Sequence, residues 1–107
     1  MEARRSKRAI LDIAAEIIDG DRRRAGTIEN LSDEGIYVVT APTKSEKDLF
    51  PGTEVEIRFW LPSGENIQLH CVVQWSYLTP PHGYTFSMGL RITDPPLTYQ
   101  EALKTLL

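Results

Sequence analysis

Two polar segments in the first third of the chain carry side chains suited to binding a small anion. The first, Arg4–Arg8, has the sequence RRSKR and places four cations in five residues. The second, Asn30–Gly35, is a turn-forming NLSDEG segment between two apolar runs. Arginine pairs in a bidentate manner with phosphate oxygens or a guanine edge, and asparagine and serine donate hydrogen bonds. A cationic arm and a polar turn on one small domain therefore favour an anion-binding site.

The distribution of charge indicates a local site rather than a general groove for polyanions. The chain has 12 basic and 15 acidic residues and a net charge of −3. Ten of the acidic residues but only five of the basic ones lie from Ala25 onward. The other seven basic residues are Arg4, Arg5, Lys7, Arg8, Arg22, Arg23 and Arg24. Because the net charge is negative and most basic residues lie near the beginning of the chain, we do not expect a nucleic-acid polymer as a partner.

Length and composition predict one globular domain in the cytoplasm. The 107 residues favour a single modest core, and an apolar content of 41% argues against intrinsic disorder. No apolar run approaches the roughly 20 residues of a membrane helix, and no signal peptide is visible, so we expect no membrane insertion. The single cysteine, Cys71, excludes an internal disulfide and a cysteine-rich zinc cluster.

Six segments separated by turn signals predict strands. They are Ile10–Ile18, Ala25–Leu31, Ile36–Thr40, Glu54–Leu61, Ile67–Tyr77 and Tyr84–Ile92. The first also fits a helix by the spacing of its isoleucines, but the Gly20-Asp21 turn behind it favours a strand. Even spacing of six strands is typical of a small antiparallel barrel or sandwich, and closing the sheet would remove its edges.

Period-2 alternation predicts which strand residues face the core. It places Trp75 inward and Trp60 on the polar face. We expect the C-terminal helix to cover Trp60, and a contact with a partner or a second copy of the chain is the second interpretation. The arginines at 22–24 are expected in a solvated turn. After Pro95-Pro96, Thr98 can cap a short helix whose leucines, including Leu97 and Leu103, would supply an apolar side.

Together, the pattern Arg4-x-x-x-Arg8 and the later Asn30-x-Ser32-x-x-Gly35 resemble the PilZ domain family. The resemblance covers roughly residues 2–93 and includes Gly89–Ile92 in the last strand. PilZ domains are bacterial receptors for cyclic dimeric GMP (c-di-GMP). The resemblance implies an all-β fold, a six-stranded antiparallel β-barrel of the split-barrel type, with a short C-terminal helix. Residues 1–9 would be a flexible basic arm, and residues 10–107 a single stand-alone barrel domain with the helix from about residue 97.

The resemblance also assigns ligand contacts in the arm. Arg4 and Arg8 would bind the guanine edges and phosphates of c-di-GMP, with Arg5 as a helper. The arm would order around the ligand, at a cost on the order of 1–2 kcal/mol for each backbone residue fixed.

In the turn motif, Asn30 and Ser32 would donate hydrogen bonds to phosphate or base, and Gly35 would let the backbone approach closely. Gly35 is also where a positive φ would be easiest. Trp75, if not in the core, could lie against a ligand base. No cofactor and no metal ligands are implied, and the absence of nucleophile-elbow and phosphate-loop motifs argues against an enzyme.

The sequence thus predicts a c-di-GMP receptor that relays its signal to an unidentified downstream protein, as a monomer or homodimer. The family commonly has a second glycine where this chain has Glu34, preceded by Asp33, and carboxylates beside a phosphate site would weaken binding. A PilZ-type interaction module without ligand, for example in pilus or motility systems, is therefore the alternative. A third hypothesis, a barrel for single-stranded nucleic acid, is disfavoured by the acidic strands.

Overall fold

The computed structural model describes residues 9–41, 50–78 and 85–106, which form six strands and one helix. The elements are β1 (Ala9–Asp19), β2 (Arg22–Leu31), β3 (Gly35–Thr40), β4 (Glu54–Trp60), β5 (Asn66–Leu78), β6 (Phe86–Ile92) and α1 (Leu97–Leu106). All six predicted strands are present, and the first is a strand rather than a helix. The arm arginines Arg4, Arg5 and Arg8 lie outside the described residues.

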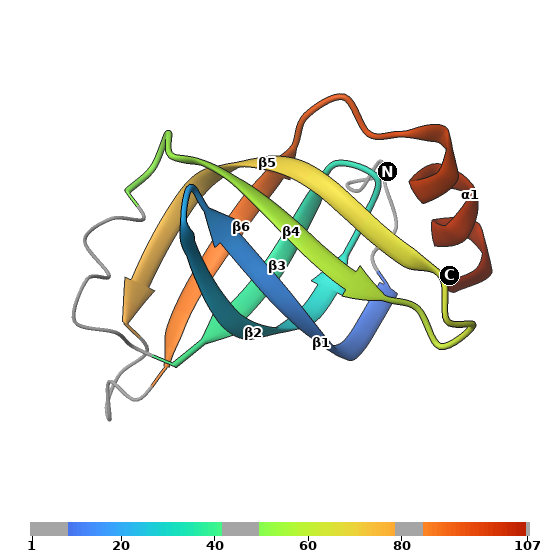
Figure 1. Ribbon diagram of the computed structural model, residues 1–107, viewed down its shortest axis with the longest axis horizontal. Helices are drawn as coiled ribbons and strands as arrows, with labels where there is room; N and C mark the ends of the chain where they lie inside the picture. Colours follow the sequence, from blue (N-terminus) through green and yellow to red (C-terminus); the bar gives the residue numbers. More distant parts are fainter. Residues whose placement is uncertain (1–8, 42–49, 79–84, 107) are drawn as a thin grey trace, which may run out of the picture.

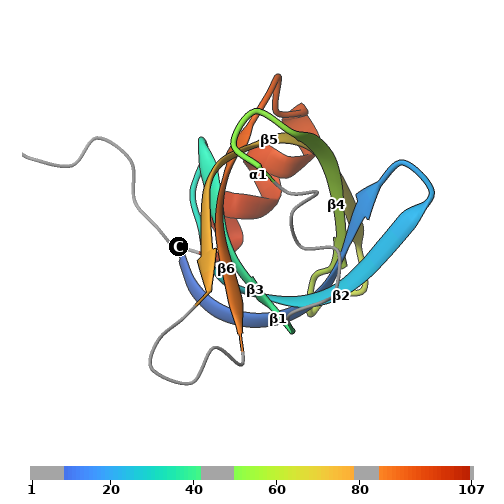
Figure 2. The ribbon, with the colours of Figure 1, turned by 90° about the vertical axis from the view of Figure 1, so that its left-hand side faces the viewer.

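The strands close into a barrel in the order β1-β2-β3-β6-β5-β4, and every neighbouring pair is antiparallel (Figure 1). This confirms the predicted six-stranded antiparallel barrel. Helix α1 lies at one end of the barrel in Figure 1, and in the view turned by 90° it falls within the outline of the strands (Figure 2). No helix among the described residues is long and apolar enough to cross a membrane.

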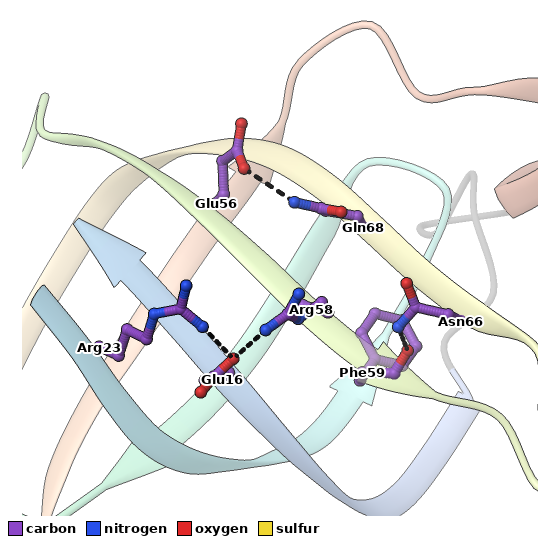
Figure 3. Close-up of polar contacts among 7 residues, drawn as sticks. All are labelled: Glu16, Arg23, Glu56, Arg58, Phe59, Asn66 and Gln68. Carbon is purple, nitrogen blue, oxygen red and sulfur yellow. Dashed lines mark hydrogen bonds and ion pairs between the residues drawn. The ribbon is translucent and has the colours of Figure 1, made fainter. Parts of the chain in front are cut away.

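The barrel closes where β1 meets β4, from Ala15 opposite Phe59 to Ile18 opposite Glu56. Figure 3 shows the polar contacts on the outer face of this seam. Glu16 accepts a hydrogen bond of 2.7 Å from the Arg58 guanidinium, directly across the seam, and forms a 3.4 Å ion pair with Arg23. Cross-strand pairs of opposite charge stabilise neighbouring strands, so the seam is held by outer ion pairs as well as by the core.

The core fills the barrel and extends under α1. Side chains from every strand are buried in one cluster, and α1 adds Tyr99, Ala102 and Leu103 to it. The burial of Leu103 was predicted, but Leu97 is 66% exposed. Helix α1 begins at Leu97, so Thr98 lies in its first turn and is not the cap that the sequence suggested.

Register shifts interrupt the alternation at several points. One lies between Ile28 and Asn30 in the pairing of β2 with β3, and another between Val73 and Trp75 in the pairing of β5 with β6. Such β-bulges insert a residue into one strand and re-aim the side chain that follows. Val73 is therefore buried, whereas Trp75 is 42% exposed. The prediction that Trp75 lies in the core was wrong for this reason.

Two other sequence expectations also differ from the structure. Arg22, Arg23 and Arg24 belong to β2 rather than to a turn, and Arg24 is buried. Trp60 faces outward as predicted, but it is 54% exposed and is not covered by α1. Its ring instead lies beside the Arg58 guanidinium, whose carbon is 5.8 Å from the ring centroid, a cation–π arrangement.

Candidate functional site

An open hollow of about 550 Å³ lies on the outer face of the barrel, at the ends of β2, β3, β5 and β6. This volume falls in the range of small-molecule sites. Its lining residues are Asn30, Ser32, Glu34, Gly35, Ile36, Tyr37, Gln74, Trp75, Gly89, Leu90 and Arg91. The hollow therefore brings together the turn motif and Trp75, four of the residues predicted for the site.

The Ser32 side chain holds the turn between β2 and β3 together. Its Oγ accepts hydrogen bonds from the backbone N–H groups of Glu34 and Gly35, each at 3.2 Å. The backbone N–H of Ser32 donates a hydrogen bond of 2.9 Å to the Gly35 carbonyl oxygen. A serine hydroxyl that accepts from backbone groups two and three residues on is a local turn device. Ser32 is fully buried, so this hydroxyl fixes the shape of the turn at the edge of the hollow.

Helix α1 supports the same turn from the core side. The buried Tyr99 hydroxyl donates a 2.5 Å hydrogen bond to the Ser32 carbonyl oxygen, across 67 positions of sequence. Sequence reasoning missed Tyr99, although its spacing of four residues from Leu103 was an available helical signal. The end of the barrel covered by α1 is thus the end that carries the candidate site.

Gly35 packs closely against β6 and does not adopt a left-handed backbone angle. It is not among the described glycines with positive φ, so that expectation was wrong. It begins β3 opposite Arg91 of β6, and a Cβ built on it would lie 3.0 Å from the Leu90 carbonyl oxygen. A side chain at this position would press on β6, which also lines the hollow.

Asn30 lies beside Tyr37, one of two aromatic residues that line the hollow. It is directly opposite Tyr37 in the pairing of β2 with β3, so the two side chains share the outer face. The ring centroids of Tyr37 and Trp75 are 5.6 Å apart, and the ring planes are tilted by 43°. The hollow thus offers an amide next to an aromatic wall, a combination suited to a planar base with polar edges.

The hollow carries one side chain of each charge, Arg91 and Glu34. Both are exposed. Within the part of the chain that the structure describes, Arg91 makes no ion pair, so its guanidinium is available to an anion. Sequence reasoning placed Arg91 outward but did not assign it to the site, because its position opposite Gly35 depends on the strand register.

The arm predicted to carry Arg4, Arg5 and Arg8 joins the barrel beside the hollow. The described chain begins at Ala9, which pairs with Leu31, the residue between the two motif side chains Asn30 and Ser32. The structure therefore places the attachment point of the arm next to the turn motif, although it does not describe the three arginines.

A second hollow, near His70, has a different chemistry. Glu56 and Asp94 contribute to its lining, and His70 pairs with Glu54 at 3.3 Å and with the Thr93 hydroxyl at 2.7 Å. This acidic surface does not suit an anion. In residues 9–41, 50–78 and 85–106, no group of three or more His, Cys, Asp or Glu side chains is arranged to hold a metal ion.

Comparison with solved structures identifies the same fold in several proteins. The Bacillus subtilis inhibitor of motility MotI/DgrA matches with a TM-score of 0.79 and 22% identity over 96% of this chain and 48% of that one. K. pneumonia MrkH in its apo state matches with a TM-score of 0.76 and 15% identity, over 99% and 53% of the two chains. The chain thus spans about half the length of these two proteins.

The PilZ domain of Escherichia coli YcgR, solved with c-di-GMP, matches with a TM-score of 0.72 and 12% identity, over 98% of this chain and 89% of that one. At these identities the structural matches establish the fold alone. No curated protein sequence matches the chain. The sequence model of the PilZ domain matches residues 2–107, and the chain therefore belongs to the PilZ domain family.

Proposed function

We propose that this protein binds c-di-GMP in the hollow beside the turn that Ser32 organises and relays the signal to a partner protein. The observation that carries the proposal is the assembly, around one hollow, of Asn30, Gly35, Trp75 and Arg91. The structures of YcgR and of a MrkH complex contain c-di-GMP on the same fold, which supports the choice of ligand.

The lining of the hollow suits the chemistry of c-di-GMP, which combines two phosphate anions with two planar guanine bases. Trp75 offers an aromatic face to a base, and Arg91 offers a guanidinium that pairs with a phosphate or a guanine edge. Asn30 adds an amide donor and acceptor on the same face.

The arm can reach this hollow from its point of attachment. An extended chain spans about 3.3 Å per residue, so Arg8 begins within one residue of the Ala9–Leu31 pair and Arg4 within about 17 Å of it. We infer that Arg4 and Arg8, with Arg5 as helper, close over the ligand. Ordering the arm costs free energy. The ligand must therefore bind the protein with its arm docked more tightly than the protein with its arm free, and this difference in affinity shifts the protein toward the docked state.

A second function is favoured by one observation, the position of Glu34. Its side chain lines the hollow, and a carboxylate there opposes a doubly anionic ligand. If this repulsion prevails, the domain would be an interaction module without ligand, in keeping with the inhibitor of motility among the proteins of the same fold.

Isothermal titration of c-di-GMP into three proteins distinguishes the two functions. The proteins are the wild type, the Arg4→Ala/Arg8→Ala variant, and a control, Arg22→Ala/Arg23→Ala, that removes the same charge from β2. We expect saturable binding by the wild type and the control and its loss in the arm variant. Absence of binding to a folded wild type would overturn the receptor proposal.

A further inference from the structure

We propose that Gly89 is a positioning residue whose missing side chain seats the Trp75 indole as a flat shelf for one guanine base. The inference rests on the proposed function and extends it to Gly89, a residue of β6 in the lining of the hollow that acts through the position of Trp75. It arises from the packing of three neighbouring strands at the hollow.

The first evidence is the space that the indole occupies. Gly89 lies directly opposite Trp75 in the pairing of β6 with β5. A Cβ built on Gly89 would lie 2.3 Å from both Cε2 and Nε1 of the indole and 2.7 Å from Cζ2. These distances are much shorter than the contact distance between two non-bonded heavy atoms, so the indole lies where a side chain of residue 89 would be. An alanine at this position cannot coexist with the present indole orientation.

The second observation is that Tyr37 lies on the other side of Gly89. Gly89 is also directly opposite Tyr37 in the pairing of β3 with β6, so the three residues form one row across β3, β6 and β5. The indole leans over the glycine toward Tyr37, with ring centroids 5.6 Å apart. The Tyr37 hydroxyl lies 3.5 Å from Ser87 Oγ, on the same strand as Gly89.

The third observation is that the Trp75 side chain is still partly exposed to solvent. The indole occupies the space beside Gly89 where a side chain would lie, yet Trp75 is still 42% exposed and lines the hollow with Arg91. An aromatic ring held from below and exposed above is a stacking platform, and loss of such a platform typically weakens binding of a base about 5- to 150-fold. An indole lifted by a side chain at residue 89 would no longer present that surface to the hollow.

A double-mutant cycle of c-di-GMP affinity tests whether Gly89 acts through Trp75. The proteins are the wild type, Gly89→Ala, Trp75→Ala and the double variant, with Trp60→Ala as a control for loss of the other exposed tryptophan. We expect Gly89→Ala to weaken binding about tenfold in the wild type and to have no further effect beside Trp75→Ala. Unchanged affinity in Gly89→Ala, or an equal loss in both backgrounds, would overturn the inference.

Folding of the variants gives a second check. If the clash with the indole unfolds Gly89→Ala, the double variant with Trp75→Ala should fold again and melt near the temperature of Trp75→Ala alone. Failure of the double variant to fold would show that residue 89 must be glycine for another reason.

A measurement without ligand separates this inference from the proposed function. The chain has two tryptophans, so Trp60→Phe leaves Trp75 as the sole indole fluorophore. In that background we expect Gly89→Ala to shift the emission to longer wavelength and to increase quenching by acrylamide. Unchanged emission and quenching would overturn the seating of the indole. Absence of c-di-GMP binding to the wild type would instead refute the proposed function and leave this result standing.

Discussion

Removal of the Tyr99 hydroxyl should destabilise the turn that carries the binding motif. In the Tyr99→Phe variant the Ser32 carbonyl oxygen loses a donor at 2.5 Å in a buried environment, with Tyr99 only 1% exposed. Leaving a buried polar group short of its partner costs about 1–3 kcal/mol. For a domain of this size, 1 kcal/mol corresponds to a shift of roughly 4–8 °C in melting temperature. We therefore expect a decrease of about 4–24 °C, measured by thermal unfolding followed by circular dichroism.

Tyr37→Phe provides a matched control for this experiment. It also removes one phenolic hydroxyl, but that group lies 3.5 Å from Ser87 Oγ and its residue is partly exposed, so its loss should cost little stability. If the two variants melted at the same temperature, the hydrogen bond from α1 to the turn would not stabilise the protein as described.

Four further predictions concern charge and protonation. Arg91→Ala should weaken c-di-GMP binding about tenfold, and Glu34→Gln should strengthen it, both by isothermal titration and with unchanged melting temperatures. Burial raises the pKa of the Cys71 thiol to about 12, so Cys71 should resist alkylation in the native protein and react once the protein is unfolded. The hydrogen bond from Arg58 holds the pKa of Glu16 below its ordinary value, so its stabilising effect is present above that value and is lost as pH falls through the lowered pKa. Glu16→Gln should therefore flatten the acid side of the melting temperature's pH profile.

The fold could be predicted from local patterns because most strands obey period-2 alternation. In β4, Val55, Ile57 and Phe59 are buried as the alternation requires, and in β5 the pattern holds through Val73. At Trp75 it fails, because the register shift between Val73 and Trp75 is a property of strand pairing and not of composition. The bulges lie beside the hollow, so the residues least predictable from periodicity are those of the candidate site.

The site could be predicted only in part, for a related reason. The turn motif is contiguous in sequence, and its members Asn30, Ser32 and Gly35 do gather at one hollow. Arg91 and Tyr99 reach the same turn from β6 and α1, and their proximity depends on register and on helix docking. Those long-range relations leave no local signal, so neither residue could be assigned to the site from the sequence.

Nuclear magnetic resonance titration of 15N-labelled protein with c-di-GMP shows whether the ligand binds in the hollow, because it locates the ligand on the barrel. We expect the backbone signals of Asn30, Gly35 and Arg91 and the indole signal of Trp75 to shift together and to saturate. Signals of Gln68 and other residues near the acidic hollow should stay in place. A titration that moves no signal of the first group, or moves only those beside Gln68, would show that c-di-GMP does not bind in the hollow.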